Sequence, residues 1–311
     1  SFRWEKESLD RNYFKEQVTG PIVSINTPFL KNGDIDYEGL GNFIDFAIDA
    51  GSRSLLFTPG DSLYIVLTDE EVAELTKFAA NHIGDRAMFL ASADCWWTGK
   101  SVEFAQYARE VGADATIVFP PTRGATVRDM VEFFKAVSEQ LPVFVLSASL
   151  APLGISSAIE AVKALLEEAP NVVGMKEDYE PQFIRQACLL AHDQWAIFAG
   201  GQKQTHMDMV PYGCDGYMSV YMTFKPEISH TYWKAIEEGN LKEAAAVIRD
   251  FDMPLFNFTL SEFPASNDAA QHGMLELAGI CGRWRRDPLP DLTDKEMEKL
   301  REFFVGLKVE V

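Results

Sequence analysis

Short apolar runs alternate with longer amphipathic segments along most of the chain. The first run, at residues 20–27, is followed by a polar turn and by a segment at 37–50 whose apolar residues recur every third or fourth position. Such a pair predicts a β-strand and a helix, and eight pairs follow one another. The predicted strands span residues 20–27, 54–57, 87–93, 115–118, 143–146, 172–175, 196–198 and 216–220, and the predicted helices span 37–50, 68–82, 98–111, 126–138, 157–169, 181–192, 204–212 and 226–238.

Strands that alternate with helices are expected to pair in parallel, because a parallel neighbour needs a crossover that the helix supplies. Eight units favour a closed ring over an open sheet. An open doubly wound sheet is the alternative, but no GxGxxG follows the first strand. The pattern therefore predicts an α/β protein with a (β/α)8 TIM barrel over residues 20–238.

The barrel is expected to carry an extension at each end. Residues 1–19 are polar and aromatic and are interpreted as an N-terminal extension that lies on the body of the protein. Residues 239–311 show helical patterns only, which predicts a C-terminal helical region. The expected helices span about 241–251, 268–280 and 293–305, and the expected breaks fall at Pro254, Pro264, Pro288 and Pro290.

Composition limits the possible partners and cofactors. A net charge of −19 over 311 residues argues against nucleic acid or an anionic membrane, since both bind basic surfaces. The four cysteines include no CxxC pair and the five histidines no HExxH, so neither a metal nor another cofactor is expected. No apolar run approaches ~18 residues, and residues 1–17 are too charged for a signal peptide, which makes the cytoplasm the expected compartment.

A single lysine closes the sixth predicted strand, in the stretch 171–178. Barrel enzymes carry their chemistry at the carboxyl ends of the strands, and a free amine there forms Schiff bases with carbonyl compounds. The structural alternative is that Lys176 extends into water at a strand end. Other side chains expected to meet Lys176 at the same mouth are those of Thr58, Asp94, Arg123, Ser147, Lys203 and Ser219.

Five short motifs follow one another in a fixed order. They are Thr58-Pro59-Gly60-Asp61-Ser62, Gly112-Ala113-Asp114, Gly174-Met175-Lys176-Glu177, the glycine-containing segment 213–219, and Gly279 with Arg286-Asp287-Pro288-Leu289. In these motifs the chain resembles a divergent member of the dihydrodipicolinate synthase / N-acetylneuraminate lyase family, the class I pyruvate-dependent aldolases, from Gly20 to about Phe304.

The resemblance implies a role for several residues. Lys176 would form the iminium with a 2-oxo acid, and Thr58 with the loop through Pro59 and Gly60 would hold the substrate carboxylate. Independently of the resemblance, the charges of Arg123 and Lys203 would balance a second acid group of the substrate or form surface ion pairs. Residues facing the substrate would also include Ser147, Gly201, Gln202, Lys203 and the Met218 backbone. Relatives of this kind are homo-oligomers, which implies a dimer or a tetramer.

The sequence also departs from the family pattern. Leu146 stands in place of the tyrosine that moves protons at the Schiff base, and Ala151 in place of an arginine that binds aspartate semialdehyde. A working enzyme needs another acid–base group in place of the tyrosine, since the loss of a general acid–base group lowers the rate ~10²–10⁴-fold. The candidates are Ser147, Tyr179, Asp61 and Asp94, each of which has an ordinary structural role as its alternative.

Three functions are compatible with these residues. The first is a carbon–carbon or carbon–oxygen lyase that acts on pyruvate or a 2-oxo-3-deoxy sugar acid through Lys176, a sugar-acid dehydratase included. The second is a catalytically impaired family member that binds a small oxo acid. A metal-dependent barrel enzyme is the third, although the sequence offers no cluster of ligands for a metal.

Overall fold

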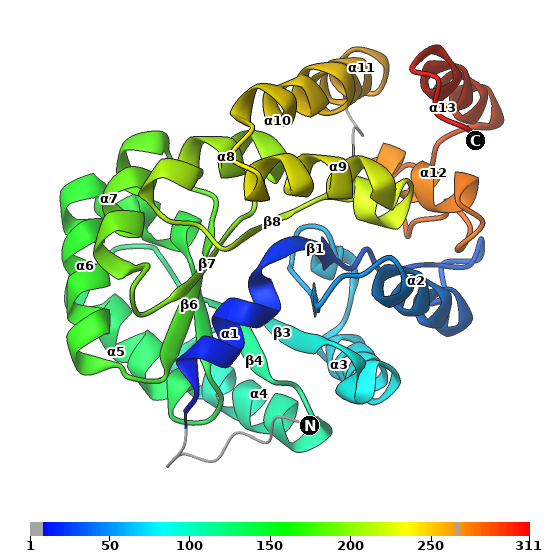
Figure 1. Ribbon diagram of the computed structural model, residues 1–311. Coiled ribbons are helices and arrows are strands. Elements are labelled where there is room, and N and C mark those ends of the chain that lie inside the picture. The colour runs from blue at the N-terminus through cyan, green and yellow to red at the C-terminus, as the bar shows by residue number, and fades with distance from the viewer. Residues whose placement is uncertain (1–8, 265–267) are drawn as a thin grey trace.

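The predicted units form a closed barrel of eight parallel strands, so the TIM barrel is confirmed (Figure 1). The computed structural model describes residues 9–264 and 268–311. Consecutive strands are neighbours, and the last strand pairs with the first. The strands are β1 Gly20–Ser24, β2 Ser54–Leu56, β3 Met88–Cys95, β4 Ala115–Phe119, β5 Val143–Leu146, β6 Val172–Glu177, β7 Ala196–Ala199 and β8 Gly216–Met218.

A ring of helices covers the outside of the barrel (Figure 1). Two of these helices begin with reciprocal capping boxes, Thr68 with Glu71 and Thr126 with Asp129, which satisfy backbone N–H groups of the first turn. The helices are α2 Tyr37–Asp49, α3 Asp69–Ile83, α4 Thr98–Val111, α5 Val127–Ser138, α6 Ile155–Glu168, α7 Pro181–Ala191, α8 Gln202–Met209 and α9 Pro226–Glu237. Short 3-10 turns follow two strands, at Ser147–Leu153 and at Val220–Thr223.

The apolar core is divided by the strands into an inner and an outer part. Successive strand residues point alternately into the barrel and toward the helices, and burial of both faces explains why the strands are continuously apolar. The inner cluster contains Ile22, Leu56, Leu90, Ile117, Phe144, Leu146, Phe198 and Met218. The barrel is therefore filled with side chains and is not a pore.

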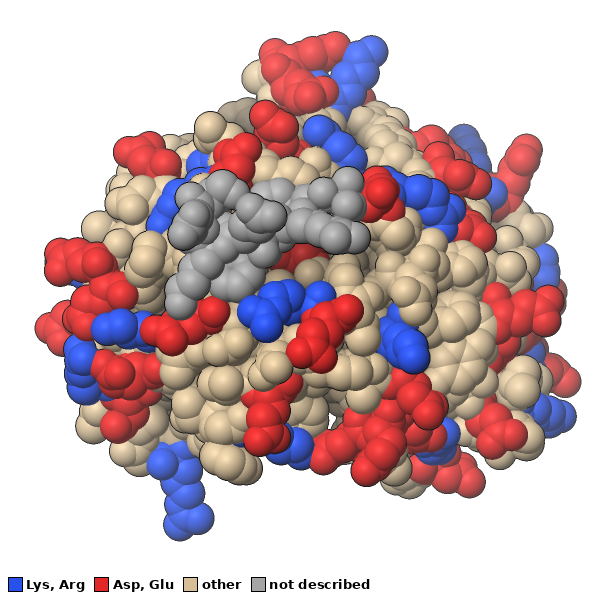
Figure 2. Space-filling view, turned by 90° about the horizontal axis from the view of Figure 1, so that it is seen from below, with Lys and Arg blue, Asp and Glu red and all other residues tan. Residues whose placement is uncertain are grey.

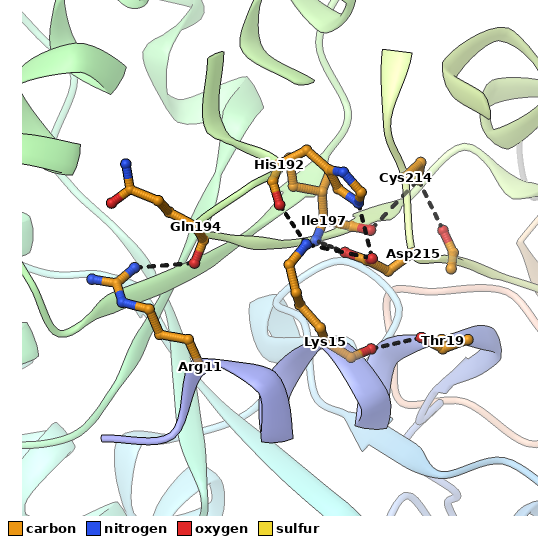
Figure 3. Close-up of polar contacts among 9 residues, drawn as sticks. Arg11, Lys15, Thr19, His192, Gln194, Ile197, Cys214 and Asp215 are labelled. Carbon is orange, nitrogen blue, oxygen red and sulfur yellow. Dashed lines mark hydrogen bonds and ion pairs between the residues drawn. The ribbon is translucent and has the colours of Figure 1, made fainter. Parts of the chain in front are cut away.

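Helix α1, Arg11–Val18, lies across the amino-terminal ends of the strands (Figure 1). Phe14 and Val18 are fully buried in the inner cluster, so this part of the N-terminal extension belongs to the core. Figure 3 shows how the helix is attached: Lys15 Nζ lies 3.6 Å from the carboxylate of Asp215, which also accepts the N–H of Ile197 at 2.8 Å. Residues 1–8 lie outside the described part of the chain. The amino-terminal end of the barrel is thus covered, which leaves the carboxyl end for a site.

The C-terminal region consists of helices, but the break expected at Pro254 was wrong. Helix α10, Leu241–Val247, continues through a π-helical turn at Ile248–Asp252 into α11, Met253–Glu262. The π turn shifts the hydrogen-bond register, with the Met253 N–H bonded to the carbonyl of Ile248, and Pro254 follows in the first turn of α11, where a missing N–H is tolerated. Helices α12, Ala269–Leu277, and α13, Asp294–Gly306, complete the chain, and α11 packs beside α13 (Figure 1).

Acidic side chains are widely distributed on the face seen in Figure 2, where they alternate with lysine and arginine. The described residues of that face form no continuous basic patch. Within residues 9–264 and 268–311, no helix has the length and apolar character that a membrane crossing requires.

Candidate active site

Lys176 lies inside the barrel near the carboxyl end of β6. Leu146 of β5 and Phe198 of β7 are its partners in the sheet, and both belong to the inner cluster. A register shift early in the β5–β6 pairing puts Gly174 against the ring of Phe144, on the inner side of the sheet. Because side chains alternate along a strand, Lys176, two residues after Gly174, also points inward. Only 8% of Lys176 is exposed. The amine is therefore held in a mostly apolar surrounding.

The carboxylate of Asp178 is the partner of this amine. Lys176 Nζ donates a hydrogen bond to Asp178 Oδ2, and the two side chains form an ion pair. The backbone N–H of Asp178 donates to Ser147 Oγ at 2.7 Å. Sequence reasoning missed Asp178, although its spacing of two residues from Lys176 could have indicated that both side chains lie on one side of the strand.

Glu177, between these residues, points to the outer side of the sheet and is fully buried. Its Oε1 accepts hydrogen bonds from Ser147 Oγ at 2.9 Å and from the N–H of Tyr179 at 2.6 Å, whereas Oε2 has no partner among the described residues. Burial raises the pKa of Glu177 to about 8. Ser147, predicted to bind substrate, is thus fully buried and connects Glu177 to the backbone of Asp178.

Glu177 is expected to make stability depend on pH. Its pKa in the folded state lies above the ordinary 4.5, so the folded protein holds the proton more tightly. The stabilising contribution is complete below about pH 4.5 and is lost as the pH rises through about 8. Urea unfolding of Glu177→Gln should show a flatter pH dependence, with a difference of ~2–4 kcal/mol across this range, since one pKa unit is about 1.4 kcal/mol. Parallel curves for the two proteins would contradict this expectation.

The loop after β2 places Thr58 across the mouth from Lys176. Thr58 Oγ1 lies 3.4 Å from the hydroxyl of Ser24 and accepts the N–H of Asp61 at 3.3 Å. Ser62 fixes the loop, because its hydroxyl accepts the N–H of Thr58 and donates to the carbonyl of Ile25 at 2.6 Å. Gly60 is at the exposed tip. This geometry presents a hydroxyl group at the rim of the barrel.

Two adjoining cavities lie beside the mouth, and they share Gln202, Val220 and Gln271. The smaller cavity is lined by Ser24, Asn26, Asp61, Met218, Ser219 and Thr223 in addition. The larger has a volume of about 180 Å³ and extends between α8 and the C-terminal helices, where Gln204, Asp252, Leu255, Phe256, Thr259, Asp268, Ala270 and Met274 line it. Lys176 lines neither of them.

Gln202 stands at the junction of these cavities. It has a φ of +65°, a strained value for a residue with a side chain, and its Oε1 accepts the N–H of Val220 at 2.9 Å. Gly201 precedes it at the start of α8, where a Cβ would lie 2.0 Å from the hydroxyl of Thr205. Gln202 and Met218, both predicted to face substrate, thus come together at the mouth.

Lys203 does not lie where the sequence analysis expected it. The side chain is completely buried, and its ammonium donates to Asp252 Oδ1 at 3.0 Å and to Ser219 Oγ at 3.2 Å. Burial lowers the pKa of Lys203 and raises that of Asp252, and the attraction between them opposes both shifts. Lys203 therefore forms neither a surface ion pair nor part of the wall of either cavity.

Arg123 is exposed in the loop after β4 and makes no ion pair with a described residue.

Two carboxylates of the sequence motifs serve the scaffold. Asp114 accepts the N–H of Phe89 at 2.8 Å and so connects the starts of β3 and β4, as Asp215 connects β7 and β8. Arg286 forms a bidentate pair with Glu71 at the start of α3, which attaches the C-terminal segment to the barrel. Within the described residues, no group of three or more His, Cys, Asp or Glu side chains is placed to hold a metal ion.

The fold and the site together define an eight-stranded barrel with a buried lysine at the end of its sixth strand. The chain belongs to the dihydrodipicolinate synthetase family, whose model matches residues 17–305. Members of this family are lyases of the class I aldolase type.

Several known proteins are similar over nearly the whole chain. The 4-hydroxy-tetrahydrodipicolinate synthase of Aquifex aeolicus is 28% identical over 91% of this chain and 95% of its own length, and that of Acetivibrio thermocellus is 27% identical over 93% and 97%. Among solved structures, Escherichia coli YagE in complex with pyruvate gives a TM-score of 0.80 at 22% identity, covering 94% of this chain and 99% of its own. The structural likeness supports the fold.

Proposed function

We propose that this protein is a lyase that forms a Schiff base between Lys176 and a 2-oxo acid. The observation that carries the proposal is the amine of Lys176, buried between Leu146 and Phe198 with a carboxylate as its partner. The similar YagE binds pyruvate in its crystal structure, which supports a 2-oxo acid as the reacting part of the substrate. The amine attacks the 2-oxo carbon, water leaves, and the iminium withdraws electrons from C3.

Thr58 is proposed to receive the carboxylate of the 2-oxo acid. Its hydroxyl faces that of Ser24 at the rim, and the backbone of Pro59 and Gly60 continues the same loop. Gly201, Gln202 and the backbone of Met218 would contact the substrate beyond the reacting carbons, with Arg123 available above the mouth for a second acid group. Neither a metal nor an organic cofactor is needed, since the iminium itself is the electron sink.

The larger cavity favours a 2-oxo-3-deoxy sugar acid as the substrate. Polar side chains line this cavity, among them Gln204, Thr259 and Gln271. Amide and hydroxyl groups form hydrogen bonds with the hydroxyl groups of a sugar acid. Ala151, at the position where the family resemblance expects an arginine, argues against aspartate semialdehyde.

Borohydride reduction tests the proposed function. Incubation with pyruvate and borohydride, followed by peptide mass spectrometry, should show a covalent adduct at Lys176. Turnover is then measured with a panel of 2-oxo-3-deoxy sugar acids, where release of pyruvate indicates an aldolase and loss of water a dehydratase. Absence of an adduct with every 2-oxo acid would contradict the proposal.

A second candidate is a catalytically impaired member that binds a small oxo acid in the cytoplasm. Leu146, which has no group that transfers protons, is the observation in its favour. An adduct at Lys176 without turnover of any sugar acid would support it.

Assembly into a dimer or tetramer stays a prediction, which sedimentation of the native protein would test.

Gly200 has no side chain, and the side chains of Lys176 and Asp178 occupy the space beside it. A Cβ at this position would lie 1.8 Å from Asp178 Oδ1 and 2.7 Å from Lys176 Nζ. Gly200→Ala should therefore displace both groups and reduce turnover ~10²-fold, as misplacement by about 1 Å does, while the fold is kept. Gly306→Ala, with no atom within 4 Å of the new Cβ, is the matched control. Equal turnover rates in Gly200→Ala and Gly306→Ala would show that Lys176 and Asp178 accommodate the added methyl group without loss of function.

A further inference from the structure

Asp178 is in contact with the nitrogen that would react. Its carboxylate accepts a hydrogen bond from Lys176 Nζ, and the sheet partner of Lys176 on β5 is Leu146, which cannot transfer a proton. We propose that Asp178 is the acid–base catalytic residue of this site and replaces the missing phenol. The inference rests on the proposed Schiff-base function.

Three of the other candidates for this role are engaged elsewhere, and the fourth, Asp61, lines the smaller cavity, which Lys176 does not line. The Ser147 hydroxyl is buried behind the strand, between Glu177 and the backbone of Asp178. Tyr179 packs its ring against Phe183 at 4.9 Å and donates its hydroxyl to the carbonyl of Ala151 at 3.3 Å. Asp94 accepts the N–H of the next residue, Cys95, at 2.7 Å. Among the described residues, Asp178 is the titratable group that contacts the amine.

Asp178 is held in place and still reaches solvent. Its N–H donates to Ser147 Oγ at 2.7 Å, which fixes the backbone beyond the strand. Gly200 lets the carboxylate approach β7, since a Cβ there would lie 1.8 Å from Oδ1. The side chain is 25% exposed, against 9% for that of Lys176, so its proton exchanges with water while the amine stays sheltered.

The carboxylate performs a balanced series of proton transfers. Asp178 removes a proton from the Lys176 ammonium, and the free amine attacks C2 of the 2-oxo acid. The carboxylic acid then protonates the carbonyl oxygen, giving a carbinolamine with a protonated nitrogen, and takes back the proton from that nitrogen. It next protonates the hydroxyl, which leaves as water when the C–N double bond forms. Finally Asp178 takes a proton from C3 of the iminium to give the enamine, and the reverse step delivers a solvent proton to C3.

Deuterium exchange into the methyl group of pyruvate isolates the last step. The native protein, Asp178→Asn and Asp178→Glu are incubated with pyruvate in D₂O and followed by proton NMR, while borohydride trapping after long incubation measures the adduct. We expect Asp178→Asn to keep the adduct but to exchange 10²–10⁴ times more slowly. Asp178→Glu should stay within ~10-fold of the native rate because it keeps a carboxylate. Asp49→Asn, at an exposed carboxylate of α2, is the control that should exchange at the native rate.

Rescue of a variant by added formate distinguishes a catalytic role of Asp178 from a structural one. Exchange by Asp178→Ala should rise with added formate, because formate supplies a carboxylate in the space that the variant opens, whereas lost packing would not respond to it. Exchange by Asp178→Asn at the native rate, or a loss seen in Asp94→Asn or Asp61→Asn instead, would overturn the role of Asp178 and leave the Schiff base intact. A native protein without adduct would overturn the proposed function and this role together.

Discussion

Replacement of Lys176 by arginine is expected to abolish the reducible adduct and to lower turnover by on the order of 10⁴–10⁶. Arginine keeps a positive charge opposite Asp178, so the ion pair that holds the strand end is retained. Its guanidinium stays protonated at any working pH and cannot act as the nucleophile. The change therefore removes the chemistry of the amine and leaves the local electrostatics largely in place.

The measurement combines peptide mass spectrometry, turnover and thermal unfolding. Lys163→Arg makes the same replacement at an exposed position of α6 and should behave as the native protein. Arginine at position 176 is longer than lysine, so circular dichroism and melting are needed to establish whether the barrel is retained. A persistent adduct in this variant would mean that another lysine reacts with the oxo acid.

The position of Lys176 could be predicted from the sequence because few contacts determine it. Alternation of short apolar strands with amphipathic helices leads to a parallel ring, and the sixth strand of that ring ends at this lysine. Its inward direction depends on a register shift between β5 and β6, which no local pattern reveals. The fold was thus predictable from periodicity, whereas the side on which the amine lies required the pairing of neighbouring strands.

Polar contacts around the lysine were less predictable. Ser147 and Asp178 come from different strand ends, and their hydrogen bond depends on how β5 and β6 are aligned. Helix α1 was missed, although Asp10 caps it and Phe14 and Val18, four residues apart, share one face of the helix. Pro254 was taken for a helix end because a π turn that accommodates proline has no signature in the sequence.

Two lysines near the mouth differ in the burial of their carboxylate partners. Lys176 pairs with a carboxylate that is 25% exposed, so the pair can separate and solvent can supply protons. The side chains of Lys203 and Asp252 are 0% and 4% exposed, and each would be left in an apolar surrounding without the other. Separating Lys203 from Asp252 would leave two buried charges unpaired, which is strongly unfavourable. This pair therefore forms a stable connection between α8 and the C-terminal helices.

Replacement of Lys203 by methionine is accordingly expected to lower the free energy of unfolding by ~3–5 kcal/mol, because Asp252 keeps a buried charge without compensation. The double variant Lys203→Met/Asp252→Leu removes both charges and should recover most of this loss, as replacement of a buried pair by apolar side chains often does. Urea unfolding of the single and double variants gives the coupling energy. Lys234→Met, in the exposed pair with Glu238, should leave the unfolding midpoint unchanged. Full stability of Lys203→Met together with a loss of turnover would instead show that this lysine serves the substrate.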